Sequence, residues 1–216
     1  MGRNRKVARN VLLSAAQQVV VGRGAAHLTL DAVANDAGVS KASVLYDYKS
    51  KGALVHALVT HGLEAENARV EQVRRLLDGT EDSGIRARIA LTARRRPSVD
   101  DRSAAVAIIS ALGCDPELKE IGRACVRETV DDITKTARNP RAALLALLAL
   151  EGLRHLEYLD LHNWSCEEFA AILADIAWLP GQQLPDDPPP PDALPPDALL
   201  SDDPSGSSAM QPLSPP

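Results

Sequence analysis

The sequence predicts an all-α protein, and three observations carry that prediction. Hydrophobic residues make up 45% of the 216 residues but aromatic residues only 3%, which favours helices packed through Ala, Leu and Val over a sheet. Apolar residues recur at helical spacing as far as about residue 180. An Asp-Pro and an Asn-Pro pair each precede one of these periodic segments, as a capping residue and a first-turn proline do in helices.

The net charge of −5 conceals a basic N-terminal segment. Residues 1–51 hold eight Lys and Arg against three acidic residues, whereas residues 52–180 hold 16 basic and 20 acidic residues. Residues 181–216 hold six Asp and no basic residue. A basic head on an acidic body is what a DNA-binding protein needs if only one end is to face phosphates.

The first helix is expected from about Lys6 to Val21, where Gly22 and Gly24 end it. Its apolar stripe consists of Val7, Val11, Ala15 and Val19. Residues 1–6 are polar and basic, and we interpret them as an arm. Because no apolar h-region follows them, a signal peptide is not expected and the protein is expected to be cytoplasmic.

Catalytic and metal-binding motifs are missing from the sequence. An odd count of three cysteines (Cys114, Cys125 and Cys166) without a secretory signal favours buried, reduced thiols, with a redox sensor as the alternative. There is no Gly-rich phosphate loop, no His-Glu-x-x-His and no Gly-x-Ser-x-Gly motif. We therefore expect no catalytic residue, no metal and no cofactor.

Residues 29–48 predict a helix-turn-helix. Thr29 is expected to cap the first short helix and Ser40 the second. The apolar face of the first helix consists of Leu30, Val33, Ala34 and Ala37. Gly38 supplies the tight turn, and Val39 is expected to be an apolar plug inside it.

The second of these helices is short, polar and basic on its outer side. We expect Val44 and Leu45 to point inward. The outward side chains are expected to be Ser40, Lys41, Ser43 and Tyr46. A helix of this kind fits the major groove of B-DNA, where hydroxyl and amine groups reach base edges and phosphates.

This pattern resembles the N-terminal domain of the TetR family of bacterial transcriptional regulators. There the sequence runs roughly A-G-V-S-x-G-T-L-Y-x-H-F-x-S-K, and the segment from Gly38 to Lys51 has the same length here. The chain departs from the pattern at Ala42, Leu45, Asp47 and Tyr48, which stand for Gly, Tyr, His and Phe.

The resemblance implies which residues contact DNA. They are Thr29, Ser40, Lys41, Ser43, Tyr46 and Lys51. Leu45 lacks the hydroxyl that binds phosphate in the family, and Tyr46 is expected to replace it. Tyr48 is expected to serve in packing.

Six further helices are expected in the body. Their ranges are 51–77, 85–96, 103–112 (buried), 117–138, 141–163 and a last helix that begins at a capping box of Ser165 and Glu168. The apolar run 142–150 is nine residues long, far short of the roughly 20 that cross a bilayer, so no membrane is expected. The resemblance implies that the last two long helices pair with those of a second copy in a homodimer.

A ligand pocket of apolar character is expected between segments 103–112, 117–138 and 141–162, because helical bundles commonly build such sites between helices. The expected lining residues are Leu112, Val126, His155 and Tyr158, and a filled core without a cavity is the alternative. For His155, a place in the core or an interface is the other interpretation. The effector would be a small molecule of unknown identity.

The sequence thus predicts three parts. Residues 1–51 are the expected DNA-binding domain, 52–180 a regulatory and dimerisation domain, and 181–216 a disordered Pro- and Asp-rich tail. The predicted function is a ligand-released repressor that binds a palindromic operator as a dimer. The alternatives are a regulator controlled by a protein partner, and an all-α enzyme or scaffold with a hairpin like a helix-turn-helix.

Overall fold

The computed structural model describes the backbone of residues 2–184 and the side chains of residues 9–184. All regular structure in that range is helical, which confirms the predicted fold class. The α-helices are α1 (Gly2–Arg23), α2 (Leu30–Asp36), α3 (Lys41–Asp47), α4 (Lys51–Leu76), α5 (Ser83–Arg94), α6 (Val99–Cys114), α7 (Pro116–Thr136), α8 (Pro140–Tyr158) and α9 (Cys166–Trp178). Two short 3-10 turns, η1 and η2, span Ala25–His27 and Leu179–Gly181. The predicted tail lies, from residue 185 onward, outside the described residues.

Side-chain caps begin most of these helices where the sequence placed them. Each capping oxygen accepts a hydrogen bond from a backbone N–H in the first turn, which satisfies a donor that the helix itself leaves unpaired. In the head the pairs are Ala32–Thr29 at 3.0 Å, Ser43–Ser40 at 3.1 Å and Ala53–Ser50 at 3.1 Å. In the body the capping residues are Asp115, Asn139 and Ser165.

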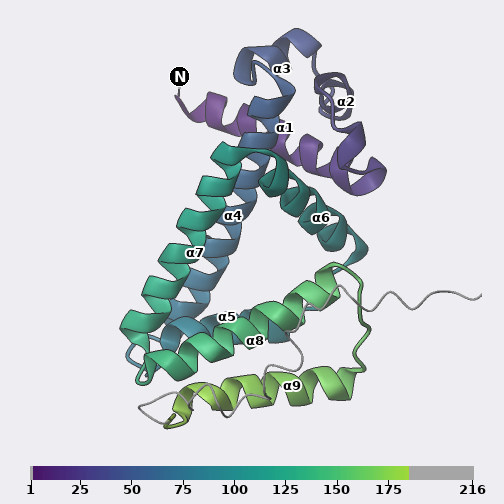
Figure 1. The fold of residues 1–216 in the computed structure, drawn as a ribbon. Coiled ribbons are helices and arrows are strands. Elements are labelled where there is room, and N and C mark those ends of the chain that lie inside the picture. Colours follow the sequence, from purple (N-terminus) through teal and green to yellow (C-terminus); the bar gives the residue numbers. More distant parts are fainter. Residues whose placement is uncertain (1, 185–216) are drawn as a thin grey trace, which may run out of the picture. The chain divides into compact units, whose positions relative to one another are not determined.

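The head core joins α1, α2, α3 and the start of α4 (Figure 1). Val33, Val44 and Leu54 lie at its centre and are fully buried. Ala107 of α6 also packs against this cluster, and α6 contacts α1. The head is therefore held by an element of the body as well as by its own helices.

The body core lies between α5, α7, α8 and α9. Ile85, Ile133 and Leu150 come from three of these helices and are fully buried. At Gly84 the backbones of α5 and α7 come so close that an added Cβ would lie 3.3 Å from the Ile133 Cα. Figure 1 shows α8 and α9 side by side.

Several predicted boundaries were wrong. Helix α1 begins at Gly2 rather than near Lys6, and α8 ends at Tyr158 rather than at residue 163. Helix α5 spans 83–94 rather than 85–96, because the chain is fixed at its start: the Asp82 carboxylate accepts a hydrogen bond from the Arg138 N–H at 3.0 Å.

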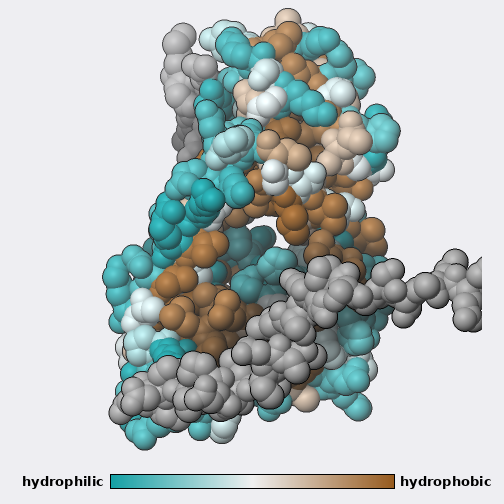
Figure 2. All heavy atoms as spheres, viewed as in Figure 1, coloured by the Kyte–Doolittle hydropathy of each residue, from teal (hydrophilic) through white to brown (hydrophobic). Residues whose placement is uncertain are grey.

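Helix α6 differs most from its prediction. It begins at Val99, four residues early, because Ser98 and Asp101 form a capping box at its start. None of its residues is fully buried, so the prediction of a buried helix was wrong. Hydrophobic atoms are visible along α6 in Figure 2, and Val106 and Ile109 are exposed. An apolar composition predicted the helix but not its packing partners.

In the part of the chain that the structure covers, no helix is both long and apolar enough for a bilayer crossing.

Candidate nucleic-acid interface

The turn between α2 and α3 is closed by its backbone. Gly38 has a φ of 66°, in the left-handed region that favours glycine. The Val39 N–H donates a hydrogen bond to the Ala34 carbonyl oxygen at 2.9 Å. The Val39 side chain is 39% exposed, so its prediction as a plug inside the turn was wrong. The left-handed glycine and the Ser40 cap set this turn without an apolar plug.

Helix α3 presents a polar face and buries the opposite one. Val44 is fully buried against the head core, whereas Lys41, Ser43 and Tyr46 are exposed. The Ser40 and Ser43 hydroxyl oxygens lie 2.9 Å apart. The helix thus places an amine, hydroxyls and a phenol together on one accessible surface of the head.

An acidic residue of α2 neutralises part of this surface. The Lys41 Nζ lies 2.8 Å from the Asp31 carboxylate, and both side chains are more than half exposed. At the C-terminal end of α3, the Arg9 Nε lies 3.3 Å from the Asp47 carboxylate. Lys41 must therefore leave Asp31 before it reaches a base or a phosphate.

The junction of α3 and α4 adds two lysines to the same region. Lys51 is the first residue of α4 and is exposed. The Lys49 Nζ lies 5.4 Å from the centroid of the Tyr46 ring, a distance at which a cation is attracted to the ring face. Lys49 was absent from the predicted contact residues. Its position two residues before Lys51, in a basic segment, was the available signal.

The two tyrosines of this region have different surroundings. Tyr46 is 65% exposed, whereas Tyr48 is 6% exposed and belongs to the head core. Burial raises the pKa of Tyr48 above its ordinary value. Leu45, on α3, is half-buried. These positions agree with the packing role expected of Tyr48 and leave Tyr46 on the accessible surface. All of the predicted contact residues lie on the head, and their role toward DNA remains a prediction.

The four residues expected to contact a ligand do not lie together. Leu112 and Val126 line an open hollow of about 610 Å³ between α6 and α7. Tyr158 lines a separate hollow of about 140 Å³. His155 is exposed, and its Nδ1 lies 2.6 Å from the Glu151 carbonyl oxygen. The role of these four residues toward an effector stays a prediction.

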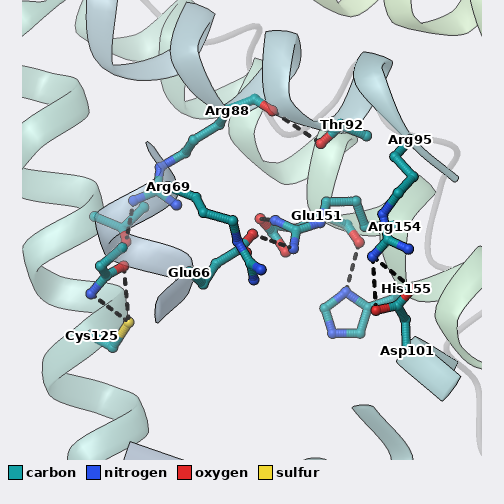
Figure 3. Close-up of polar contacts among 12 residues, drawn as sticks. Glu66, Arg69, Arg88, Thr92, Arg95, Asp101, Cys125, Glu151, Arg154 and His155 are labelled. Carbon is teal, nitrogen blue, oxygen red and sulfur yellow. Dashed lines mark hydrogen bonds and ion pairs between the residues drawn. The ribbon is translucent and has the colours of Figure 1, made fainter. Parts of the chain in front are cut away.

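The smaller hollow is surrounded by ion pairs of arginine, which sequence reasoning missed. Figure 3 shows Arg154 bound to Glu66 and Glu151, and Arg69 on the same side of α4 as Glu66. Although burial lowers the pKa of Arg154, the charges of Glu151 and Glu66 raise it above the ordinary value overall. Charged residues within otherwise apolar helices were the signal available in the sequence.

A further arginine nearby is half-buried. The Arg88 Nη2 donates a hydrogen bond to the Thr129 hydroxyl at 2.9 Å. Its Nε is buried and has no hydrogen-bond partner among the described residues. Burial lowers the pKa of Arg88. No group of three or more metal-ligating side chains is found among the residues whose side chains the structure describes.

Two family models match the sequence. Residues 12–58 match the model for bacterial regulatory proteins of the tetR family, and residues 82–179 match the model for the tetracyclin repressor-like C-terminal domain. The two matches together cover more than half of the chain. No curated protein is similar to the chain at a significant level.

Solved structures share this fold at low sequence identity. A transcriptional regulator from Rhodococcus sp. Rha1 is 20% identical, with a TM-score of 0.64 over 79% of this chain and 94% of its own. A transcriptional regulator from Saccharomonospora viridis, solved in complex with choline, is 15% identical, with a TM-score of 0.63 over 80% and 94%. The multidrug binding protein EbrR, solved with malachite green, is 20% identical, with a TM-score of 0.57 over 78% and 96%.

Proposed function

The chain belongs to the TetR family of bacterial transcriptional regulators, and we propose that it is a repressor that binds a palindromic operator as a homodimer. In this proposal, the dimer releases the operator when a small molecule enters the body. The observation that carries the proposal is the exposed polar face of α3. Lys41, Ser43 and Tyr46 stand out from a helix whose other side is locked into the head core by Val44. A rigid helix with amine and hydroxyl groups outward is suited to the major groove.

The proposed contacts divide into two kinds. Lys41 and Ser43 are placed to reach base edges, because they lie at the N-terminal end of α3, the end that enters the groove in this motif. Thr29, Tyr46 and Lys51 are placed to hold the phosphates on either side. Thr29 and Lys51 lie at helix N-termini, where the backbone N–H groups favour an anion. We add Lys49 to this second set.

Exposed apolar side chains support a dimer through α8 and α9. From Leu145 onward the exposed residues of α8 are apolar with the exception of His155: they are Leu145, Leu148, Ala149, Gly152 and Leu156. On α9 the exposed residues include Ala170, Ala171, Ala174 and Trp178. Leu148 is 68% exposed and Trp178 63%, so a lone copy leaves large apolar side chains in water. Small residues beside leucines allow two helices to approach closely.

Helix α6 offers a route from the body to the head. It contacts α1, and Ala107 packs against the head core. An added Cβ on Gly62 of α4 would lie 3.7 Å from Ile108 of α6. Elements with few buried side chains are the ones that shift at low cost, and α6 has none that is fully buried. A ligand that displaces α6 therefore acts on two helices of the head at once.

Small molecules bound in two of the similar structures support a ligand-binding role for the body. A ligand shifts a two-state equilibrium only by its difference in affinity for the two states. We therefore expect an effector to bind more weakly when saturating operator is present.

Selection of DNA sequences by the purified protein tests the proposal. Random duplexes are enriched over several rounds, and the expected result is an inverted repeat whose half-sites lie about one helical turn apart. A library that yields no common sequence would overturn the assignment. A screen for compounds that dissociate the selected complex then tests the ligand-released part independently.

A further inference from the structure

A small hollow in the body has a charge arrangement that selects its ligand. It has a volume of about 140 Å³, below the roughly 300–1,000 Å³ of sites for drug-sized ligands, so its occupant is small. The walls come from α4, α5, the segment after α5, the start of α6, and α8. The positively charged lining residues are Arg69, Arg94, Arg95 and Arg154, and the negatively charged ones are Glu66, Asp101 and Glu157.

Every lining carboxylate is already paired with arginine. Glu66 accepts hydrogen bonds from Arg69 at 2.6 Å and from Arg154 at 3.1 Å. A cation entering the hollow therefore meets, at Glu66, a carboxylate whose negative charge is already balanced by two guanidinium groups.

The other two carboxylates are paired in the same way. Asp101 lies 2.8 Å from an Nη2 of Arg95. Glu157 is 3% exposed and is paired with Arg96. The carboxylates that line the hollow are thus neutralised by arginines of the protein itself.

The guanidinium groups retain unused donors. Each guanidinium carries five N–H donors. Arg69 uses Nε and Nη2 on Glu66, and Arg95 uses Nη2 on Asp101. Arg94 is exposed and has no ion-pair partner among the described residues. The surplus is of donors and of positive charge, which matches an anion and especially a planar carboxylate that accepts two parallel hydrogen bonds.

The uncharged lining residues match a small apolar or aromatic group. Leu91, Pro97 and Tyr158 contribute carbon surface to the hollow. The Arg154 guanidinium lies 5.8 Å from the centroid of the Tyr158 ring, so a flat surface and a positive charge lie side by side. We propose that this hollow binds a small organic carboxylate, and that this class of compound is the effector; the second part rests on the proposed function.

Calorimetric titration with sodium benzoate tests the binding site directly. Choline chloride, a cation, and inorganic phosphate, an anion without an apolar part, are the comparison probes, and potassium chloride keeps the ionic strength equal. We expect saturable binding of benzoate, with phosphate weaker and choline without saturation. Arg94→Gln should weaken benzoate binding by about tenfold, because it removes charged donors without breaking an ion pair.

Two further variants define the location. Arg69 also lines the hollow, so Arg69→Gln should weaken benzoate binding, while Glu66 keeps its pairing with Arg154. Arg123 lines the other hollow, between α6 and α7, so Arg123→Gln should leave benzoate affinity unchanged. Circular dichroism verifies that each variant is folded.

Any of four results would overturn the proposal. The first two are saturable binding of choline but not of benzoate, and binding of no probe. The other two are equal binding of phosphate and benzoate, and loss of benzoate binding in Arg123→Gln alone. Because the calorimetry contains no DNA, it is independent of the proposed function. If benzoate binds as expected but does not weaken a selected operator complex, the binding site stands and its role as the effector site fails.

Discussion

The ammonium group of Lys41 lies 2.8 Å from the carboxylate of Asp31, so the first residue of the exposed helix α3 is tied to the first turn of α2. Both side chains are exposed, and ion pairs of this kind contribute only about 0.2–1 kcal/mol. The ion pair therefore positions Lys41 but is weak enough for Lys41 to exchange Asp31 for a DNA contact. The pair also places a negative charge close to where a DNA phosphate would lie.

Removing that negative charge should strengthen DNA binding. Asp31→Asn frees Lys41 and reduces repulsion of phosphate, and we expect about a threefold gain in affinity for any duplex. Asp36→Asn is the control, because it removes the same charge from the same helix without freeing Lys41. Fluorescence anisotropy with a labelled duplex measures both. Equal gains in the two variants would show that only net charge matters and that Lys41 does not contact DNA.

Lys51 should act on phosphate rather than on bases. Lys51→Ala is expected to weaken binding to all sequences alike and to lower the slope of log affinity against log salt by about 0.9, the value for one phosphate contact. Ser43→Ala, in contrast, should change the preferred base at one position. Lys135→Ala, exposed on α7, is the control and should leave the slope unchanged. An unaltered slope in Lys51→Ala would exclude the phosphate contact.

The two tyrosines of the head provide a matched pair. Tyr46→Phe should cost about 1 kcal/mol of DNA affinity, because the Tyr46 hydroxyl is proposed to replace the one missing at Leu45. Tyr48→Phe should leave affinity unchanged, because Tyr48 is 6% exposed and packs in the head core. Competition titrations on one selected duplex compare the variants. A larger loss from Tyr48→Phe than from Tyr46→Phe would reverse the assignment.

The sequence predicted the head more accurately than the body. Local signals placed Thr29 and Ser40 as caps, since a cap depends on residues only three positions away. The predicted burial of Val39 was wrong, because the burial of one apolar side chain in a turn depends on which elements pack over it. The paired arginines were missed for the same reason. Arg154 meets Glu66 across 88 positions of sequence, a contact that no local pattern encodes.

Helix α6 shows the same limit in the body. Its apolar composition predicted burial, but its residues lie between the head and the body and are at most half-buried. The start of α6 is set by the capping box of Ser98 and Asp101, which lies before the apolar segment, so that segment alone does not predict where the helix begins. The predicted apolar run 142–150, by comparison, includes Leu145 and Leu148, which are exposed on α8.

The dimer can be tested through one exposed leucine. Leu148→Glu on α8 should weaken self-association by about 2 kcal/mol or more, because it places a charge within the proposed interface. Leu76→Glu is the control: Leu76 is 74% exposed at the end of α4, outside that interface. Sedimentation velocity over a range of concentrations measures both. A wild-type protein that stays monomeric at all concentrations would contradict the proposed dimer.

If the head reads DNA sequence, the protein must prefer its selected site strongly over other duplexes, and one affinity ratio measures that preference. The ratio compares the selected inverted repeat with a scrambled duplex of the same length and composition, at one salt concentration near physiological ionic strength. We expect a ratio of roughly 10³ or more, as for specific DNA-binding proteins, and a large fall in this ratio when Lys41 and Ser43 are both replaced by Ala. A ratio near one, with tight binding to both duplexes that disappears as salt rises, would contradict it by showing attraction to phosphate alone.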